Sequence, residues 1–415
     1  MFEGLEISKN AALCSEWMNQ WPVLFLTFKD VDGLTFASAK EMLLNRIAAI
    51  YNDHSYLLEG TRVQENDRKV FERLADEVSG NPTDAMLKTS IVLLMRLMRN
   101  HYGKPVILLI DEYDVPIAKA SAKGYYPEML EVIKGLMSTA LKDNDALRFA
   151  VITGCLRMAK ESIFTGTNNF VSDTISSSHL NEYFGFTQAD VDQILEDANC
   201  QEHAADIKNW YDGYHFGDLD VYCPWDVINY IADYLNDPQM QPKLYWLNTS
   251  GNYIIRQLIK RADANMREEI EQLIAGQSIC KEIKIELTYK DLDILEYGDN
   301  DASRNNLWSI LYTTGYLTTR VCDGRKYELT IPNREIHDIF VTQIKEWMQD
   351  TIILGNLSQL KEFWQAVATG NVPVFEEMFR NYLLKTISIR DTNTTIDKKE
   401  NFYHGLLLGI LRGNI

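Results

Sequence analysis

The residues best suited to chemistry are two adjacent acids that directly follow an apolar run. Val106 to Ile110 is wholly apolar, and Asp111 and Glu112 come next. A strand of this kind would deliver the acids to the carboxyl edge of a sheet, where open α/β sheets bind ligands. Asp111 would there be a metal-binding residue for Mg²⁺, which prefers oxygen ligands, and Glu112 a catalytic residue that accepts a proton from attacking water. The alternative is that both acids are ordinary loop or helix-cap residues.

An apolar run followed by two acids is the Walker B pattern, whose usual partner is the phosphate-binding loop GxxxxGK[ST]. The glycines of that loop let backbone N–H groups approach the phosphates, and its lysine reaches the terminal phosphates. The 415 residues contain no match to this loop. The nearest imitation is Gly154–Glu161, in which Ala159 stands at the second glycine and Glu161 at the Ser/Thr position. Its place after the Asp111 strand would also require a permuted fold.

The elements that must position these residues alternate between strand-like and helix-like patterns. Short apolar runs predict buried strands, and apolar residues spaced by three and four predict amphipathic helices. Such an alternation indicates an α/β fold with a parallel sheet and flanking helices. The predicted strands are 22–28, 106–110 and 147–153, and the predicted helices are 38–51, 87–98 and 127–140.

Beyond about residue 180 helical patterns dominate, and the aromatic stretch Trp210–Trp225 stands out. Its rings could stack on a base, but with few basic residues nearby we expect a core cluster. The predicted helices are 187–198, 225–235, 252–275 and 303–314, with a short strand at 327–331, further helices to about 386 and a last helix at 402–411. We therefore predict an α/β domain over 1–180, a mainly helical region over 181–390, and the start of a further domain over 391–415.

Composition excludes several classes of protein. Lys and Arg number 41 against 59 Asp and Glu, which gives a net charge of −18 and disfavours broad binding to nucleic-acid phosphates. The six cysteines form no CxxC pair, and no HExxH occurs. The first residues resemble no signal peptide, and no apolar run approaches the ~18 residues of a membrane span. We expect a cytoplasmic protein without a membrane partner.

Several blocks together resemble the AAA-ATPase-like family of bacteria. Its members typically carry a P-loop-NTPase-like domain that binds ATP and Mg²⁺, often followed by a PD-(D/E)XK nuclease-like domain. The blocks are spread over nearly the whole chain. Each block alone is a weak sign of the family, but their combination in this order is specific for it. They are Val106–Asp114, Thr153–Asn169, Trp210–Phe216, Tyr222–Asp226, Tyr245–Gly251, Thr314–Leu317, Tyr327–Asn333 and Phe402–Gly409.

The resemblance implies roles for two further residues. Thr153 ends the third strand, where such ATPases place a polar residue that senses the γ-phosphate; alternatively its hydroxyl bonds the local backbone. Arg157 could neutralise phosphate charge or pair with nearby acids such as Glu161. We therefore predict Thr153 and Arg157 as cofactor-binding residues. Glu400 and His404 lie one helical turn apart, but no third metal ligand stands near them.

The resemblance also implies two departures from the family. Members usually begin earlier, with a strand and the phosphate-binding loop, and their nuclease-like domain continues further. We therefore expect a chain that is inactive as written, although the family's complete form binds and hydrolyses ATP. The alternative is a non-catalytic interaction scaffold derived from an ATPase fold. Its partner would be an unknown protein or a second copy, and nucleic acid enters only through the family resemblance.

Overall fold

The structure, a computed structural model, divides the chain into two compact units. Unit 1 contains residues 1–172 and 284–306, and unit 2 contains residues 173–283 and 307–415. The predicted domain edges near 180 and 390 stay predictions, and 391–415, with the predicted helix at 402–411, lie outside the described residues. The described residues are 4–59, 63–77, 82–154, 171–246, 264–285, 287, 301–323, 326–353, 365–366 and 369–386.

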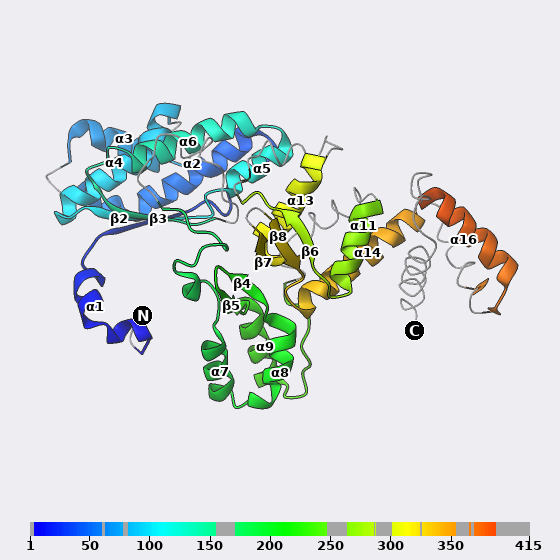
Figure 1. Cartoon of the computed structure of the whole chain (residues 1–415). Helices are drawn as coiled ribbons and strands as arrows, with labels where there is room; N and C mark the ends of the chain where they lie inside the picture. The colour runs from blue at the N-terminus through cyan, green and yellow to red at the C-terminus, as the bar shows by residue number, and fades with distance from the viewer. Residues whose placement is uncertain are drawn as a thin grey trace. The chain divides into compact units, whose positions relative to one another are not determined.

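Unit 1 is built on a parallel sheet in which β2 lies between β1 and β3. Phe25 of β1 pairs with Leu109 of β2, and Leu109 pairs in turn with Val151 of β3. Helices α2, α4 and α6 run together along one side of this sheet (Figure 1). The elements are α1 (Ala11–Trp17), β1 (Val23–Thr27), α2 (Phe36–Asp53), α3 (Glu65–Ala75), α4 (Asp84–Tyr102), β2 (Val106–Asp111), α5 (Val115–Lys123), α6 (Tyr126–Leu141) and β3 (Leu147–Ile152), with short 3₁₀ turns at Glu6–Lys9 and Ser55–Glu59.

The two faces of the sheet differ in burial. Along β2, Val106, Leu108 and Ile110 are fully buried, whereas the side chains between them are only half-buried. On that second face, Phe25 of β1 is 55% exposed and Phe149 of β3 is 54% exposed. Strands β1 and β3 are therefore less buried than the apolar runs predicted. An apolar run has the same composition whether one face or both faces are covered, so the sequence pattern does not separate the two cases.

Local signals in the sequence set the ends of the helices that cover the sheet. Thr35 and Ser38 form a reciprocal capping box at the start of α2. Thr83 caps the start of α4 by accepting a hydrogen bond from the backbone N–H of Met86 at 3.3 Å. Gly103 ends α4 in the left-handed conformation. These caps hold the buried faces of α2 and α4 against β1 and β2.

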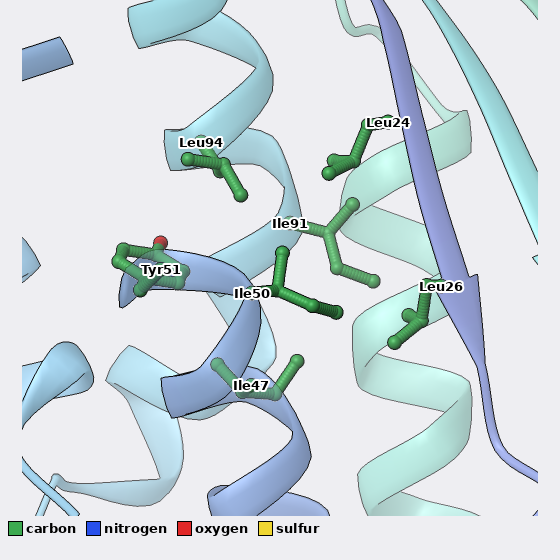
Figure 2. A pocket seen from close by; sticks show the side chains of 7 residues that line it. All are labelled: Leu24, Leu26, Ile47, Ile50, Tyr51, Ile91 and Leu94. Carbon is green, nitrogen blue, oxygen red and sulfur yellow. The ribbon is translucent and has the colours of Figure 1, made fainter. Parts of the chain in front are cut away.

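The core between β1, α2 and α4 is closely filled. A small gap of about 10 Å³ remains there. Its size is at the lower limit for a single water molecule, and its walls are almost wholly apolar. We therefore do not regard it as a ligand site. Figure 2 shows the side chains that line it: Leu24, Leu26, Ile47, Ile50, Tyr51, Ile91 and Leu94.

Unit 2 combines helices with two small antiparallel sheets. One sheet is the hairpin β4–β5, and the other has the order β6-β8-β7. The helices are α7 (Gln188–Asp197), α8 (Ala204–Tyr211), α9 (Pro224–Asn236), α11 (Ala264–Ile274), α14 (Arg334–Ile353) and α16 (Val372–Thr386), with α13 (Asp301–Thr313) crossing the boundary between the units, and 3₁₀ turns at Asn181–Tyr183 and Gln201–His203. The strands are β4 (Tyr214–Phe216), β5 (Leu219–Val221), β6 (Ile279–Glu282), β7 (Thr318–Asp323) and β8 (Lys326–Thr330).

The aromatic stretch predicted as a core cluster forms part of the core of unit 2. Tyr211 and Tyr222 are buried in one hydrophobic cluster with residues of α7 and α9. Trp210 is partly buried against this cluster, and the central carbon of the Arg334 guanidinium lies 4.6 Å from the centroid of its ring. Trp225 is 53% exposed and is an exception to the predicted burial.

The predicted fold class is confirmed: the chain is α/β, with a parallel sheet and flanking helices in its N-terminal part and a mostly helical region after it. Strand β1 and helix α9 lie within two residues of their predicted bounds. Helix α5 and the strands of the β4–β5 hairpin were not predicted as elements, because they are too short to show a periodicity. No helix in the described part of the chain is both long and apolar enough to cross a membrane.

Candidate functional site at the carboxyl edge of the parallel sheet

The ends of three parallel strands meet at one edge of the unit 1 sheet. Asp111, the last residue of β2, pairs with Thr27, the last residue of β1. On the other side, the backbone N–H of Thr153 donates to the carbonyl of Ile110 at 2.9 Å. Because these strands run in the same direction, polar side chains at their carboxyl ends converge. The fold thus brings together the predicted residues Asp111, Glu112 and Thr153.

The most specific contact at this edge joins Asp111 to Thr153. The Thr153 hydroxyl donates a hydrogen bond to Oδ1 of Asp111 at 2.6 Å. A bond this short to an ionised acceptor is among the stronger kinds of hydrogen bond. It fixes the orientation of the carboxylate and uses only one of its two oxygens. Thr153 itself is solvent-exposed, so the carboxylate is held at an open edge.

Glu112 occupies a turn that few residue types adopt readily. Its φ is +53°, in the left-handed region, and its carbonyl accepts a hydrogen bond from the N–H of Val115 at 3.2 Å. A non-glycine residue there is uncommon, and such outliers often mark functional positions. The turn ends β2 at once and leads into α5. It therefore keeps Glu112 at the sheet edge beside Asp111.

A close packing contact beneath the edge was missed by the sequence analysis. Asp114 is 3% exposed and Tyr113 is 7% exposed. A Cβ placed on Gly154 would lie 2.5 Å from Oδ1 of Asp114 and 2.6 Å from Cε1 of Tyr113. Only a glycine fits there without displacing one of them. The apolar-acidic pattern includes Asp114, but no periodicity in the sequence reveals that it meets Gly154.

The oxygen atoms at this edge suit Mg²⁺ as a partner of a bound phosphate. Among the described residues, no group of three or more His, Cys, Asp or Glu side chains is arranged to hold a metal ion. Mg²⁺, however, usually takes one or two carboxylates and fills its remaining positions with water and substrate phosphates. A single carboxylate oriented by a neighbouring hydroxyl fits that mode.

One predicted phosphate-binding residue, Arg157, lies outside the described residues. The same holds for most of the loop-like segment 154–161, of which only Gly154 is described. The role of Arg157 therefore stays a prediction.

Removing the Thr153 hydroxyl tests whether it orients Asp111. We expect Thr153→Val to reduce the stability of unit 1 by about 1 kcal/mol, because a hydrogen bond to a charged acceptor is lost at an exposed site. Thr153→Ser, which keeps the hydroxyl, should recover most of that loss. Urea unfolding of the three proteins measures the difference. Equal destabilisation by Val and Ser would show that the methyl group, and not the hydroxyl, stabilises this edge.

Comparison with known proteins agrees with the resemblance found in the sequence. Residues 1–164, which include β1, β2 and β3, match the family model described as Predicted AAA-ATPase. The expected resemblance to the AAA-ATPase-like family is thereby confirmed for the part of the chain that forms the site.

One curated relative extends the similarity beyond this region. It is described as an uncharacterized protein in the vnfD 5' region of Azotobacter chroococcum mcd 1. The two are 28% identical over 316 residues, which cover 72% of this chain and 54% of the relative. The chain thus spans about half the length of that relative, whose description states no activity. The comparison with solved structures gave no match.

Proposed function

We propose that unit 1 is a nucleotide-handling domain of the ATPase class, with its Walker B-type site at the carboxyl edge of the sheet. The observation that carries the proposal is the 2.6 Å hydrogen bond from Thr153 to Asp111. It presents an oriented carboxylate where open α/β sheets bind ligands. The match of residues 1–164 to the Predicted AAA-ATPase family supports the same proposal.

Each residue at this edge has a distinct part in the proposal. Asp111 would hold Mg²⁺ through the oxygen that Thr153 does not use, and the ion would offset the charge of bound phosphates. Glu112, held at the edge by its left-handed turn, would accept a proton from the water that attacks the terminal phosphate. Thr153 would be a positioning residue for Asp111, and on the family resemblance it would also contact the γ-phosphate.

The proposal also predicts weak binding by these residues alone. The 415 residues contain no GxxxxGK[ST] loop, and such a loop supplies many of the charge-assisted hydrogen bonds to a triphosphate. We therefore expect detectable but weak binding of ATP with Mg²⁺, and no ATP turnover above the uncatalysed background.

The test compares Asp111→Asn with the wild-type chain. Asparagine keeps the shape of the side chain and an oxygen that can accept from Thr153, but it removes the charge that attracts Mg²⁺. We expect ATP with Mg²⁺ to stabilise the wild-type protein by about 1.4 kcal/mol at ten times the dissociation constant. The variant should lose most of this gain. Thermal unfolding with ATP, in the presence of Mg²⁺ or of EDTA, measures the effect.

Asp145→Asn is the matched control, because Asp145 is an exposed aspartate at the opposite edge of the same sheet, just before β3. It should respond to the nucleotide as the wild type does. An equal response of wild type and Asp111→Asn, or the same response with EDTA, would contradict the proposal.

The second candidate is a non-catalytic interaction scaffold. It is favoured by the apolar side chains on the less covered face of the sheet, where Phe25, Phe149, Val23 and Val151 are 44–55% exposed. Exposed apolar side chains gathered on one face often mark a protein–protein contact. On this reading a second copy of the chain covers the face. Concentration-dependent dimerisation that Phe149→Ser weakens, in a protein that shows no response to ATP with Mg²⁺, would favour the scaffold.

A further inference from the structure

Unit 2 contains two buried carboxyl groups that lie side by side on different helices. Asp226 is in the first turn of α9 and Glu335 is in the first turn of α14. Asp226 is 0% exposed and Glu335 is 1% exposed. Two ionised carboxylates in such a place would repel each other and lack the solvation that a charge requires.

The hydrogen bonds around the pair distinguish its four oxygens. Oε1 of Glu335 accepts from the backbone N–H of Tyr245 and from that of Trp246, the latter at 2.8 Å. Oε2 of Glu335 and both oxygens of Asp226 are buried, and no N–H or O–H group of the described residues donates to them. The two carboxyl groups lie within hydrogen-bonding distance of each other, and the weak donor near them is the thiol of Cys223, which contacts Asp226. Buried oxygens without a donor are rare in folded proteins. A proton on Oε2 of Glu335 would supply the missing donor, with Asp226 as its acceptor.

The surroundings of the pair offer no positive charge in place of that proton. No lysine or arginine among the described residues pairs with either carboxyl group; the guanidinium of Arg334 lies over the ring of Trp210. The titratable neighbours are all neutral groups whose pKa is raised by loss of solvation. They are Tyr211 of α8, Tyr214 of β4, Cys223 before α9, and Tyr245.

We propose that Asp226 and Glu335 share one proton, and that this proton is a pH-sensitive lock holding the first turns of α9 and α14 together. The lock also includes the segment at Tyr245 and Trp246, because Oε1 of Glu335 binds both of their backbone N–H groups. When the proton leaves, two buried negative charges remain in contact, and the packing of the two helix ends weakens. This inference is independent of the site in unit 1.

The direction of the pH effect follows from the pKa of Glu335. Burial, together with the neighbouring Asp226 carboxylate, raises that pKa to about 8 from an ordinary 4.5. Between these values the folded protein binds a proton that the unfolded chain has released, so stability falls as pH rises. For one proton, the unfolding constant of unit 2 should rise about tenfold per pH unit within this window. It should be insensitive to this pair above the window, whereas at its acid end the raised pKa of the buried Asp226 adds to the slope.

The experiment compares wild type with Glu335→Gln, whose amide can donate to Asp226 at every pH. Urea unfolding gives the unfolding constant of each protein at several values between about pH 4.5 and pH 8. When its logarithm is plotted against pH, the slope for the wild type should exceed the slope for Glu335→Gln by about one proton. Glu196→Gln, an exposed change on α7, should keep the wild-type slope. Equal slopes for wild type and Glu335→Gln would overturn the proposal. A difference near two protons would also overturn it, because each carboxyl group would then hold its own proton.

A second measurement does not depend on folding of the variant. Infrared difference spectra of the wild-type protein should show the carbonyl band of a protonated carboxylic acid at neutral pH. That band should disappear with a midpoint near the pKa of about 8. Its absence at neutral pH would show that both groups are ionised and that no proton is shared.

Discussion

Leu108→Ala is expected to reduce the stability of unit 1 by about 3–5 kcal/mol, because it leaves a cavity under the central strand of the sheet. Leu108 is fully buried on the face of β2 that the helices cover. Hydrogen–deuterium exchange in a peptide spanning β2 reports the free energy of local opening. In the variant, the amides of that peptide should exchange faster than in the wild type, at a rate that approaches the one set by global unfolding.

Leu109→Ala is the matched control for this substitution. Leu109 is the next residue on the same strand, but it is half-buried on the less covered face. Truncating the Leu109 side chain should reduce the stability of unit 1 by about 1–2 kcal/mol, because this side chain buries less apolar area than that of Leu108. An equal cost for the two substitutions would show that both faces of the sheet are covered equally, and it would contradict the one-sided arrangement described above.

Gly213→Ala is expected to destabilise unit 2 by about 3–5 kcal/mol, through backbone strain and overlap together. Gly213 has φ of +103°, and a Cβ there would overlap the carbonyl oxygen of Pro332. Because Gly213 links α8 to β4 and Pro332 precedes α14, neither backbone can move without disturbing an element. Hydrogen–deuterium exchange should show lost protection in peptides of α8 and α9.

Gly276→Ala separates strain from overlap. Gly276 also has a positive φ, +75°, but no atom lies within 4 Å of the added Cβ. We expect Gly276→Ala to reduce the stability of unit 2 by only about 1 kcal/mol, because the alanine is strained by the positive φ but meets no neighbouring atom. If Gly213→Ala were as mild as Gly276→Ala, the close approach of Pro332 would not be a constraint in solution.

The sequence predicted that Asp111 and Glu112 lie at the carboxyl edge of the sheet, because two simple rules apply to them. Val106 to Ile110 is too apolar for a surface segment, and the acids that follow such a strand lie at its carboxyl edge. The apolar pattern also predicted that Thr153 ends the next strand, whereas its predicted role came from the family resemblance. The hydrogen bond between Thr153 and Asp111 was not predicted, because it depends on the register between β2 and β3.

Long-range contacts explain most of what the sequence did not reveal. The contact of Gly154 with Asp114 depends on how two loops meet, and neither loop has a periodic pattern. Asp226 and Glu335 each resemble an ordinary acid in the first turn of a helix, a favourable position for negative charge. Their juxtaposition depends on how α9 and α14 pack together. Periodic patterns thus predicted the longer elements and one edge of the sheet, but not these side-chain pairs.

The most direct test of the proposed metal–nucleotide site at Asp111 asks whether a bound metal ion lies at the carboxyl edge of the unit 1 sheet. Paramagnetic Mn²⁺, added with ATP in place of Mg²⁺, broadens the NMR signals of nearby methyl groups. In methyl-labelled protein the Thr153 signal should vanish first, while the signal of Val106, at the opposite end of β2, should broaden less. Asp111→Asn should abolish the selective effect. A sharp Thr153 signal at saturating Mn²⁺ and ATP, or equal broadening of Thr153 and Val106, would contradict a metal–nucleotide site at Asp111.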